Sequence, residues 1–147
     1  ALIGDVVPFA YDPKVQQIAH VLFTMQDAVG PSQMIVLAAR KGFLDANRPA
    51  LTDFFEDMER SLHWFLDPKN HEAAVAIIAA FTKRPAASYA DWVLTAKDFY
   101  HAPDIRPNVA AMQHEIETER RLGFLKADLD IKRYVDLGFV DAAAARQ

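Results

Sequence analysis

The chain contains no cysteine and only 5 glycines among its 147 residues. Without cysteine the protein forms no disulfide, has no thiolate nucleophile and builds no zinc finger. The few glycines do not occur at the spacings of phosphate-binding loops. No apolar run approaches the roughly 20 residues that a membrane-spanning helix needs. These absences exclude thiol chemistry, zinc fingers and glycine-rich phosphate sites.

Neither sign of charge dominates the composition. Asp and Glu number 20 against 16 Lys and Arg, which gives a net charge of -4 at pH 7, and 52% of the residues are hydrophobic. Such a balance is typical of a globular domain and provides no general basic face for nucleic acid. The length is that of one ordinary domain with a core of its own. We therefore expect a globular protein with no nucleic-acid partner.

Three apolar segments have the length of β-strands. Residues 34–38 show no amphipathic alternation, which is typical of a strand buried on both faces. Residues 2–7 and 18–23 are two further strand-like pieces, although the second is also compatible with a short helix. Three short strands make a poor sheet alone. The expected fold is α/β and helix-dominated, with few strands and about four main helices.

The first predicted helix is the strongest in the chain. Asn47 is a suitable N-cap, Pro49 follows at the first turn, and the pattern continues to about Leu66. Apolar residues at steps of three and four predict a face in the core: Leu51, Phe54, Phe55, Met58, Leu62, Phe65 and Leu66. The other face is expected in solvent and comprises Asp53, Glu56, Asp57, Glu59 and Arg60.

Further helices are predicted after this one. They cover residues 71–81, 87–95 and 108–122, with Asn70 as a cap of the first and Gly123 as the C-terminal cap of the last. A proline-bounded loop occupies residues 100–107, and two short turns lie at residues 131–135 and 140–145. Helical segments therefore fill most of the chain after residue 47.

Several segments occur in an order that is similar to one family of proteins. These are residues 7–9 (VPF), 36–44 (VLAARKGFL), 50–55 (ALTDFF), 63–71 (HWFLDPKNH), 123–124 (GF) and 134–140 (YVDLGFV). In this order they resemble the C-terminal part of the periplasmic substrate-binding proteins of ABC importers. The similar branch binds sulfonates, taurine, nitrate and thiamine precursors. The resemblance spans almost the whole chain.

The resemblance implies a bilobal, type II periplasmic-binding fold whose lobes close on a small solute of the sulfonate or nitrate kind. Residues 1–32 would form the end of the second lobe and the hinge crossover, and residues 33–147 the C-terminal helical part of an incomplete lobe. The chain would then be a truncated or proteolysed fragment, periplasmic or otherwise extracytoplasmic, without its signal peptide. In the intact protein the partners would be the solute and the permease subunits. The fragment itself would form a homo-oligomer or a strand-exchanged dimer.

Three side chains are candidates for contact with the solute. Phe9 and Tyr11 follow the strand-like residues 2–7, and Gln33 precedes residues 34–38. From these positions a side chain can reach a cleft between the lobes. Each has an ordinary alternative, because Phe9 could simply pack in the core, Tyr11 could close a turn, and Gln33 could cap the strand. Arg40 and Lys41 suggest an anionic ligand, but we expect them at the surface.

The search for catalytic and metal-binding motifs finds no complete enzyme motif, and we expect a protein that is not an enzyme. Residues 114–118 (HEIET) begin like a zinc-protease helix, but Thr118 stands where the second histidine belongs. Glu59, His63 and Asp67 are four residues apart and could hold a metal, but a solvated charged face is the expected arrangement. We expect no cofactor and no metal. Two alternatives to the receptor stay open: a stand-alone helical interaction module, and an enzyme similar to thiamine-pyrimidine synthases, against which the lack of cysteine argues.

Overall fold

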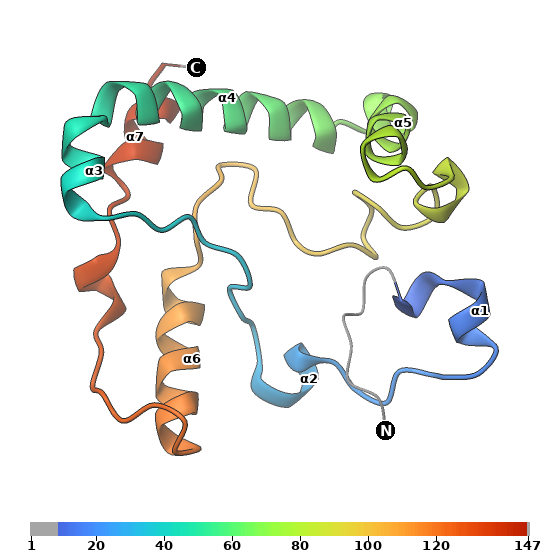
Figure 1. The fold of residues 1–147 in the computed structure, drawn as a ribbon, viewed down its shortest axis with the longest axis horizontal. Helices are drawn as coiled ribbons and strands as arrows, with labels where there is room; N and C mark the ends of the chain where they lie inside the picture. Colours follow the sequence, from blue (N-terminus) through green and yellow to red (C-terminus); the bar gives the residue numbers. More distant parts are fainter. Residues whose placement is uncertain (1–8, 147) are drawn as a thin grey trace. The chain divides into compact units, whose positions relative to one another are not determined.

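The computed structural model describes residues 9–146, and every regular element within them is helical (Figure 1). The predicted α/β fold is therefore wrong for this part of the chain. Residues 18–23 and 34–38 are irregular and largely exposed. A strand persists only where a neighbouring backbone completes its ladder, and no described segment supplies one. The strand predicted at residues 2–7 lies outside the described residues.

The elements follow one another in a simple order. The α-helices are α1 (Pro13–Gln16), α2 (Met25–Val29), α3 (Lys41–Ala46), α4 (Arg48–Leu66), α5 (His71–Thr82), α6 (Val109–Arg121) and α7 (Gly138–Ala144). Short 3-10 turns are η1 (Phe9–Tyr11), η2 (Pro68–Asn70), η3 (Ala86–Ser88) and η4 (Ile131–Tyr134). None of the helices in residues 9–146 is both long and apolar enough to cross a membrane.

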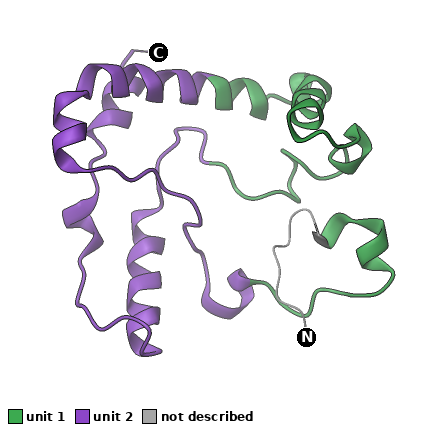
Figure 2. Cartoon of the chain, viewed as in Figure 1, with its two compact units in different colours: residues 1–24, 61–101 green, residues 25–60, 102–147 purple. Residues whose placement is uncertain are grey.

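The chain divides into two compact units, which Figure 2 colours separately. Unit 1 comprises residues 1–24 and 61–101, and unit 2 comprises residues 25–60 and 102–147. Helix α4 contributes residues to both. The predicted division at residue 33 concerned the lobes of a longer protein and stays a prediction.

Unit 1 has a small aromatic core. Its buried residues are Val75, Tyr89, Trp92 and Val93, against which Tyr11, Ile78, Ala79 and Leu94 pack. The Tyr89 hydroxyl donates to Thr82 Oγ1 at 2.9 Å, and Trp92 Nε1 donates to the Ser88 carbonyl at 2.8 Å. Both buried polar groups are therefore satisfied.

The helix predicted at residues 87–95 is wrong, because the chain turns there instead. Only η3 is regular, and Leu94 adopts a left-handed φ of 55°. The buried Asp98 carboxylate accepts the Leu94 N–H at 2.6 Å and the Phe99 N–H at 2.8 Å. The Asp98 side chain thus accepts backbone N–H groups that a helix would have bonded to its own carbonyls.

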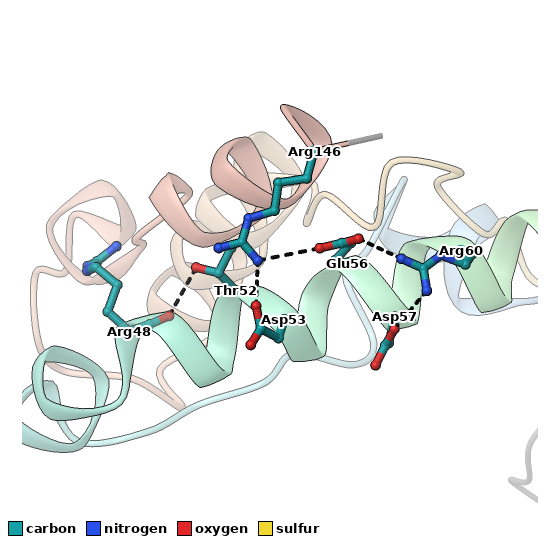
Figure 3. A network of polar contacts seen from close by, with 7 residues as sticks. All are labelled: Arg48, Thr52, Asp53, Glu56, Asp57, Arg60 and Arg146. Atoms are coloured by element: carbon teal, nitrogen blue, oxygen red, sulfur yellow. Dashed lines mark hydrogen bonds and ion pairs between the residues drawn. The ribbon is translucent and has the colours of Figure 1, made fainter.

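Unit 2 is built around the contact between α7 and the first part of α4. Phe139, Val140 and Ala143 of α7 are buried, and the Phe139 ring lies 6.0 Å from the Phe55 ring. Figure 3 shows Arg146 reaching Asp53 and Glu56 of α4. At the other end of this contact Arg48 pairs with Asp136 at 2.7 Å and stacks on Phe139.

The buried face of α4 differs from the predicted one. Thr52 and Glu59 are buried, whereas Phe54 is 48% exposed and Trp64 is 39% exposed. Thr52, Phe55 and Glu59 are three or four residues apart, so they form one stripe along the helix. The Thr52 hydroxyl donates to the Arg48 carbonyl and is thereby satisfied. The expectation of a solvated Glu59 and a buried Phe54 is wrong.

Candidate functional site

A groove in unit 2 is the candidate site. It has a volume of about 240 Å³ and lies between helix α6, turn η4 and the irregular segment after α2. Its lining residues are Gln33, Val36, Met112, Glu115, Ile116, Glu119 and Ile131. Segments distant in sequence therefore converge on one concave surface.

Helix α6 supplies the floor of the groove. Four lining residues of α6 are spaced three or four positions apart and so share one face of the helix: Met112, Glu115, Ile116 and Glu119. The Asn108 side chain caps this helix by accepting the Ala111 N–H at 2.9 Å. At the other end Gly123 adopts a φ of 82°, which confirms the predicted C-terminal cap.

The η4 wall is fixed to α6 by one side chain. Gln113 Oε1 accepts the Ile131 N–H at 3.0 Å, and Gln113 Nε2 donates to the Leu129 carbonyl at 3.3 Å. These two bonds hold Ile131 beside the helix. The opposite wall is held by His114, whose Nε2 lies 2.9 Å from the Val29 carbonyl oxygen.

Gln33 lines the groove, but its amide is already engaged. Gln33 Oε1 accepts the Asn108 N–H at 2.7 Å, and Gln33 Nε2 donates to the Ile35 carbonyl at 2.8 Å. The Gln33 N–H donates to Glu115 Oε1 at 3.0 Å. The side chain thus bonds backbone, as the alternative to ligand contact anticipated, and also ties the segment to the start of α6. Its contact with a solute stays a prediction.

Tyr11 is not among the described residues that line this groove. Tyr11 lies in unit 1, where its hydroxyl donates to the Lys97 carbonyl at 2.7 Å and its ring stacks on Trp92 at 5.5 Å. Phe9 begins η1, and its side chain lies outside the described residues. Solute contact by either residue stays a prediction.

The charge of the groove is negative. Glu115 and Glu119 are the charged members of its lining, and no Lys or Arg belongs to that set. An anion at this position meets two carboxylates, and none of the described lining residues offers a compensating cation. The groove therefore disfavours a sulfonate or nitrate and admits a neutral or cationic solute.

A second cavity, of about 270 Å³, lies in unit 1. Its lining residues are Phe65, Leu66, Asp67, Pro68, His71, Leu94 and Thr95. The hydrogen bond from Lys69 lowers the pKa of the Asp67 carboxyl, and His71 Nε2 lies 3.1 Å from the Ala90 carbonyl oxygen. These polar groups serve local structure, whereas the first groove also has Glu119, whose carboxylate has no hydrogen bond or ion pair with a described residue. The first groove is therefore the better candidate.

The alternative metal site at Glu59, His63 and Asp67 and the two predicted surface residues can each be located in the structure. Residues 9–146 contain no group of three or more His, Asp or Glu side chains arranged to hold a metal ion. Asp67 lies beyond the end of α4, where it accepts the Lys69 N–H. Lys41 is exposed and pairs with Asp45 at 2.9 Å, and Arg40 is also exposed, so their predicted surface positions are confirmed.

Sequence reasoning missed the α6 side of the groove. Glu115 lies within the segment 114–118, and Glu119 follows it. The pattern of this segment indicated only an incomplete zinc-protease motif. The signal available was the spacing of Met112, Ile116 and the two glutamates along one helical face. Comparisons of the chain with protein-family models, with curated proteins and with solved structures gave no significant match.

Proposed function

We propose that the chain belongs to the solute-binding component of an ABC importer, a non-enzymatic receptor that acts outside the cytoplasm and delivers its solute to a permease. The order of the segments described above supports the family. The observation that carries the proposal is the groove beside Gln33. Its volume of about 240 Å³ lies just below the range of about 300–1,000 Å³ typical of drug-sized ligands, and so suits a small solute.

The lining of the groove narrows the solute. Met112, Ile116 and Ile131 provide apolar walls, and Glu115 and Glu119 provide hydrogen-bond acceptors. A small neutral or positively charged organic solute matches both. An aminomethyl-pyrimidine of the thiamine-precursor kind meets this description better than taurine or nitrate does.

Calorimetric titration of the purified protein tests the proposal. The probes are an aminomethyl-pyrimidine, a small primary amine, taurine and nitrate. We expect saturable binding of one of the first two probes. We expect no binding of nitrate, nor of taurine, because its sulfonate group would meet Glu115 and Glu119. Met112→Trp fills the groove and should abolish binding, whereas Phe124→Trp, at an exposed position outside the lining, should leave it unchanged. Unaltered binding in Met112→Trp, or no binding of any probe, would overturn the proposal.

A second candidate is the helical interaction module. It is favoured by a different observation, the exposed large apolar side chains of residues 18–25 and 34–37. Exposed apolar surface of this extent is typical of a surface that another molecule covers. The two candidates separate experimentally, because a module would bind a macromolecule but no small solute.

A further inference from the structure

The segment between α2 and α3 exposes four consecutive large apolar side chains. Met34, Ile35, Val36 and Leu37 are between 47% and 75% exposed. The segment has no regular structure, although Ile and Val are among the residues most favoured in strands. It therefore combines the composition of a buried strand with the exposure of a loop.

In a β conformation the backbone of this segment would have one occupied and one unoccupied edge. In a β conformation successive residues direct their N–H and C=O groups to opposite edges. On one edge the Gln33 N–H donates to Glu115 and the Ile35 carbonyl accepts from the Gln33 amide. On the other edge, no hydrogen bond within residues 9–146 engages the backbone of Met34, Val36 or Ala38. An edge of this kind is a template for another strand.

We propose that this free edge pairs antiparallel with the same segment of a second copy of the chain. Val36 lies opposite Val36 of the second copy, and Met34 lies opposite its Ala38. Each of these pairs exchanges two backbone hydrogen bonds, and the arrangement closes on itself by two-fold symmetry. The inference goes beyond the proposed function and does not rest on it.

Charge complementarity supports a second copy as the occupant. In this register Ala39 of one copy lies opposite Gln33 of the other, and Arg40 is the next residue. The Gln33 N–H donates to Glu115 within its own chain. Arg40 of each copy then lies opposite Ser32 of the other and on the same face of the paired strands as Val36, which lines the groove with Glu115 and Glu119. No charged residue within segment 32–40 lies opposite another of like sign. Because two short strands alone are marginally stable, the dimer is expected to be weak and reversible.

The absence of cysteine permits a direct test in solute-free buffer. A Val36→Cys variant has a single thiol, and the Cα atoms of the two Val36 residues would lie about 5.5 Å apart, within the range that a disulfide bridges. We expect mild oxidation to yield a covalent dimer several-fold faster than in Ile18→Cys, although this control places the thiol at a more exposed apolar position in unit 1, 86% exposed against 47% for Val36. Leu37→Cys should also react slowly, because its counterpart lies two residues along the strand.

A charge swap provides the second arm. Arg40→Glu, added to the Val36→Cys variant, should slow its cross-linking, and adding Glu119→Arg as well should restore the rate, with circular dichroism showing the same helix content throughout. Equal cross-linking rates for Ile18→Cys, Val36→Cys and Leu37→Cys would indicate random collision and overturn the proposal. Faster reaction of Leu37→Cys than of Val36→Cys would overturn the register. Binding of solute in the groove is measured separately on the cysteine-free chain, so either proposal can fail alone.

Discussion

Arg48 shows how one side chain can join two elements. Its guanidinium pairs with Asp136 at 2.7 Å and lies 4.1 Å from the centre of the Phe139 ring. The hydrogen bond from Arg48 is the main reason that the pKa of the Asp136 carboxyl lies below its ordinary value. Both partners of the ion pair are more than 40% exposed, so solvent screens much of their attraction.

Arg48→Met should lower the free energy of unfolding by about 1 kcal/mol at pH 7, because it removes the ion pair and the cation-π contact. A carboxyl with a lowered pKa stabilises the fold above its ordinary pKa and loses that contribution as the pH falls through the lowered value. The difference in unfolding free energy between wild type and Arg48→Met should therefore become smaller as the pH falls below 3.8, the ordinary pKa of this carboxyl, because the ion pair no longer contributes to it. Urea titrations of variant and wild type over a series of acidic pH values measure it.

The matched control for this variant is Arg60→Met. Arg60 pairs with Glu56 and Asp57 on the exposed side of α4 (Figure 3), and its side chain is 62% exposed. Pairs of this kind contribute about 0.3–0.5 kcal/mol. A loss in Arg60→Met equal to that in Arg48→Met would show that the contacts of Arg48 with Asp136 and Phe139 add nothing beyond an ordinary surface ion pair.

Phe54 and Phe139 form a second residue-scale comparison. Phe139→Ala should cost about 3–5 kcal/mol, because that side chain is 3% exposed. Phe54→Ala should cost about 1 kcal/mol, because nearly half of its surface already contacts water. Thermal unfolding followed by circular dichroism measures both. Equal losses of stability would indicate that Phe54 is buried, as the periodicity of this helix predicted.

Burial along α4 shows the limit of sequence patterns at this scale. The periodicity identified an amphipathic helix but not which residues α7 would cover. Phe55 was correctly expected in contact, whereas Glu59 became buried because it continues the stripe of Thr52 and Phe55. Which face is buried depends on a tertiary partner more than 80 residues away, and no local spacing encodes it.

At the scale of elements, the long helices were predictable because local chemistry sets their ends. The predicted ranges 47–66, 71–81 and 108–122 agree closely with α4, α5 and α6. Asn108, Gly123 and the proline after Asp67 act within one turn of the backbone they terminate. The predicted helix at 87–95 failed because its turn depends on Asp98, which lies beyond the segment.

The C-terminal ends of α5 and α6 permit a matched pair of substitutions. Lys83 ends α5 with a left-handed φ of 57°, where α6 is followed by Gly123. Lys83→Gly should raise stability by about 0.5–1 kcal/mol, because glycine adopts this conformation without strain. Gly123→Ala should lower it by about 1 kcal/mol through strain alone, because an added Cβ meets no atom within 4 Å. Differential calorimetry measures both, and a loss in the first variant or a gain in the second would contradict this account.

At the scale of the whole molecule, each unit has buried residues of its own. Val75 and Trp92 belong to unit 1, and Phe139 and Ala143 to unit 2. Both tryptophans, Trp64 and Trp92, lie in unit 1. Tryptophan fluorescence therefore reports on unit 1, whereas far-ultraviolet circular dichroism reports on all helices.

Urea unfolding should separate these signals. Val75→Ala should shift the fluorescence transition to lower urea, because it removes buried methyl groups from unit 1. Phe139→Ala should shift the circular dichroism transition more than the fluorescence transition. Coincident shifts of both probes in both variants would instead indicate a single cooperative unit.

The error in fold class also belongs to this scale. Residues 34–38 have the composition of a buried strand, but a strand exists only when distant backbone pairs with it. Helices require no such partner, which explains why the three long helices were predicted correctly and the sheet was not. Gln33 shows the same distinction, since its place in the groove depends on Glu115 and Asn108, both more than 70 residues away.

The irregular stretch that ends at Arg40 also determines how trypsin would cut the protein. Trypsin needs an arginine or lysine in backbone that opens locally, and Arg40 is exposed at the end of such a stretch. The first cut is expected after this residue, ahead of any site inside α4 or α6. The nicked protein would separate into two pieces on a denaturing gel. In native buffer the bonds from Gln33 to Asn108 and Glu115 would resist their dissociation, so cleavage there would pass unnoticed by sizing alone.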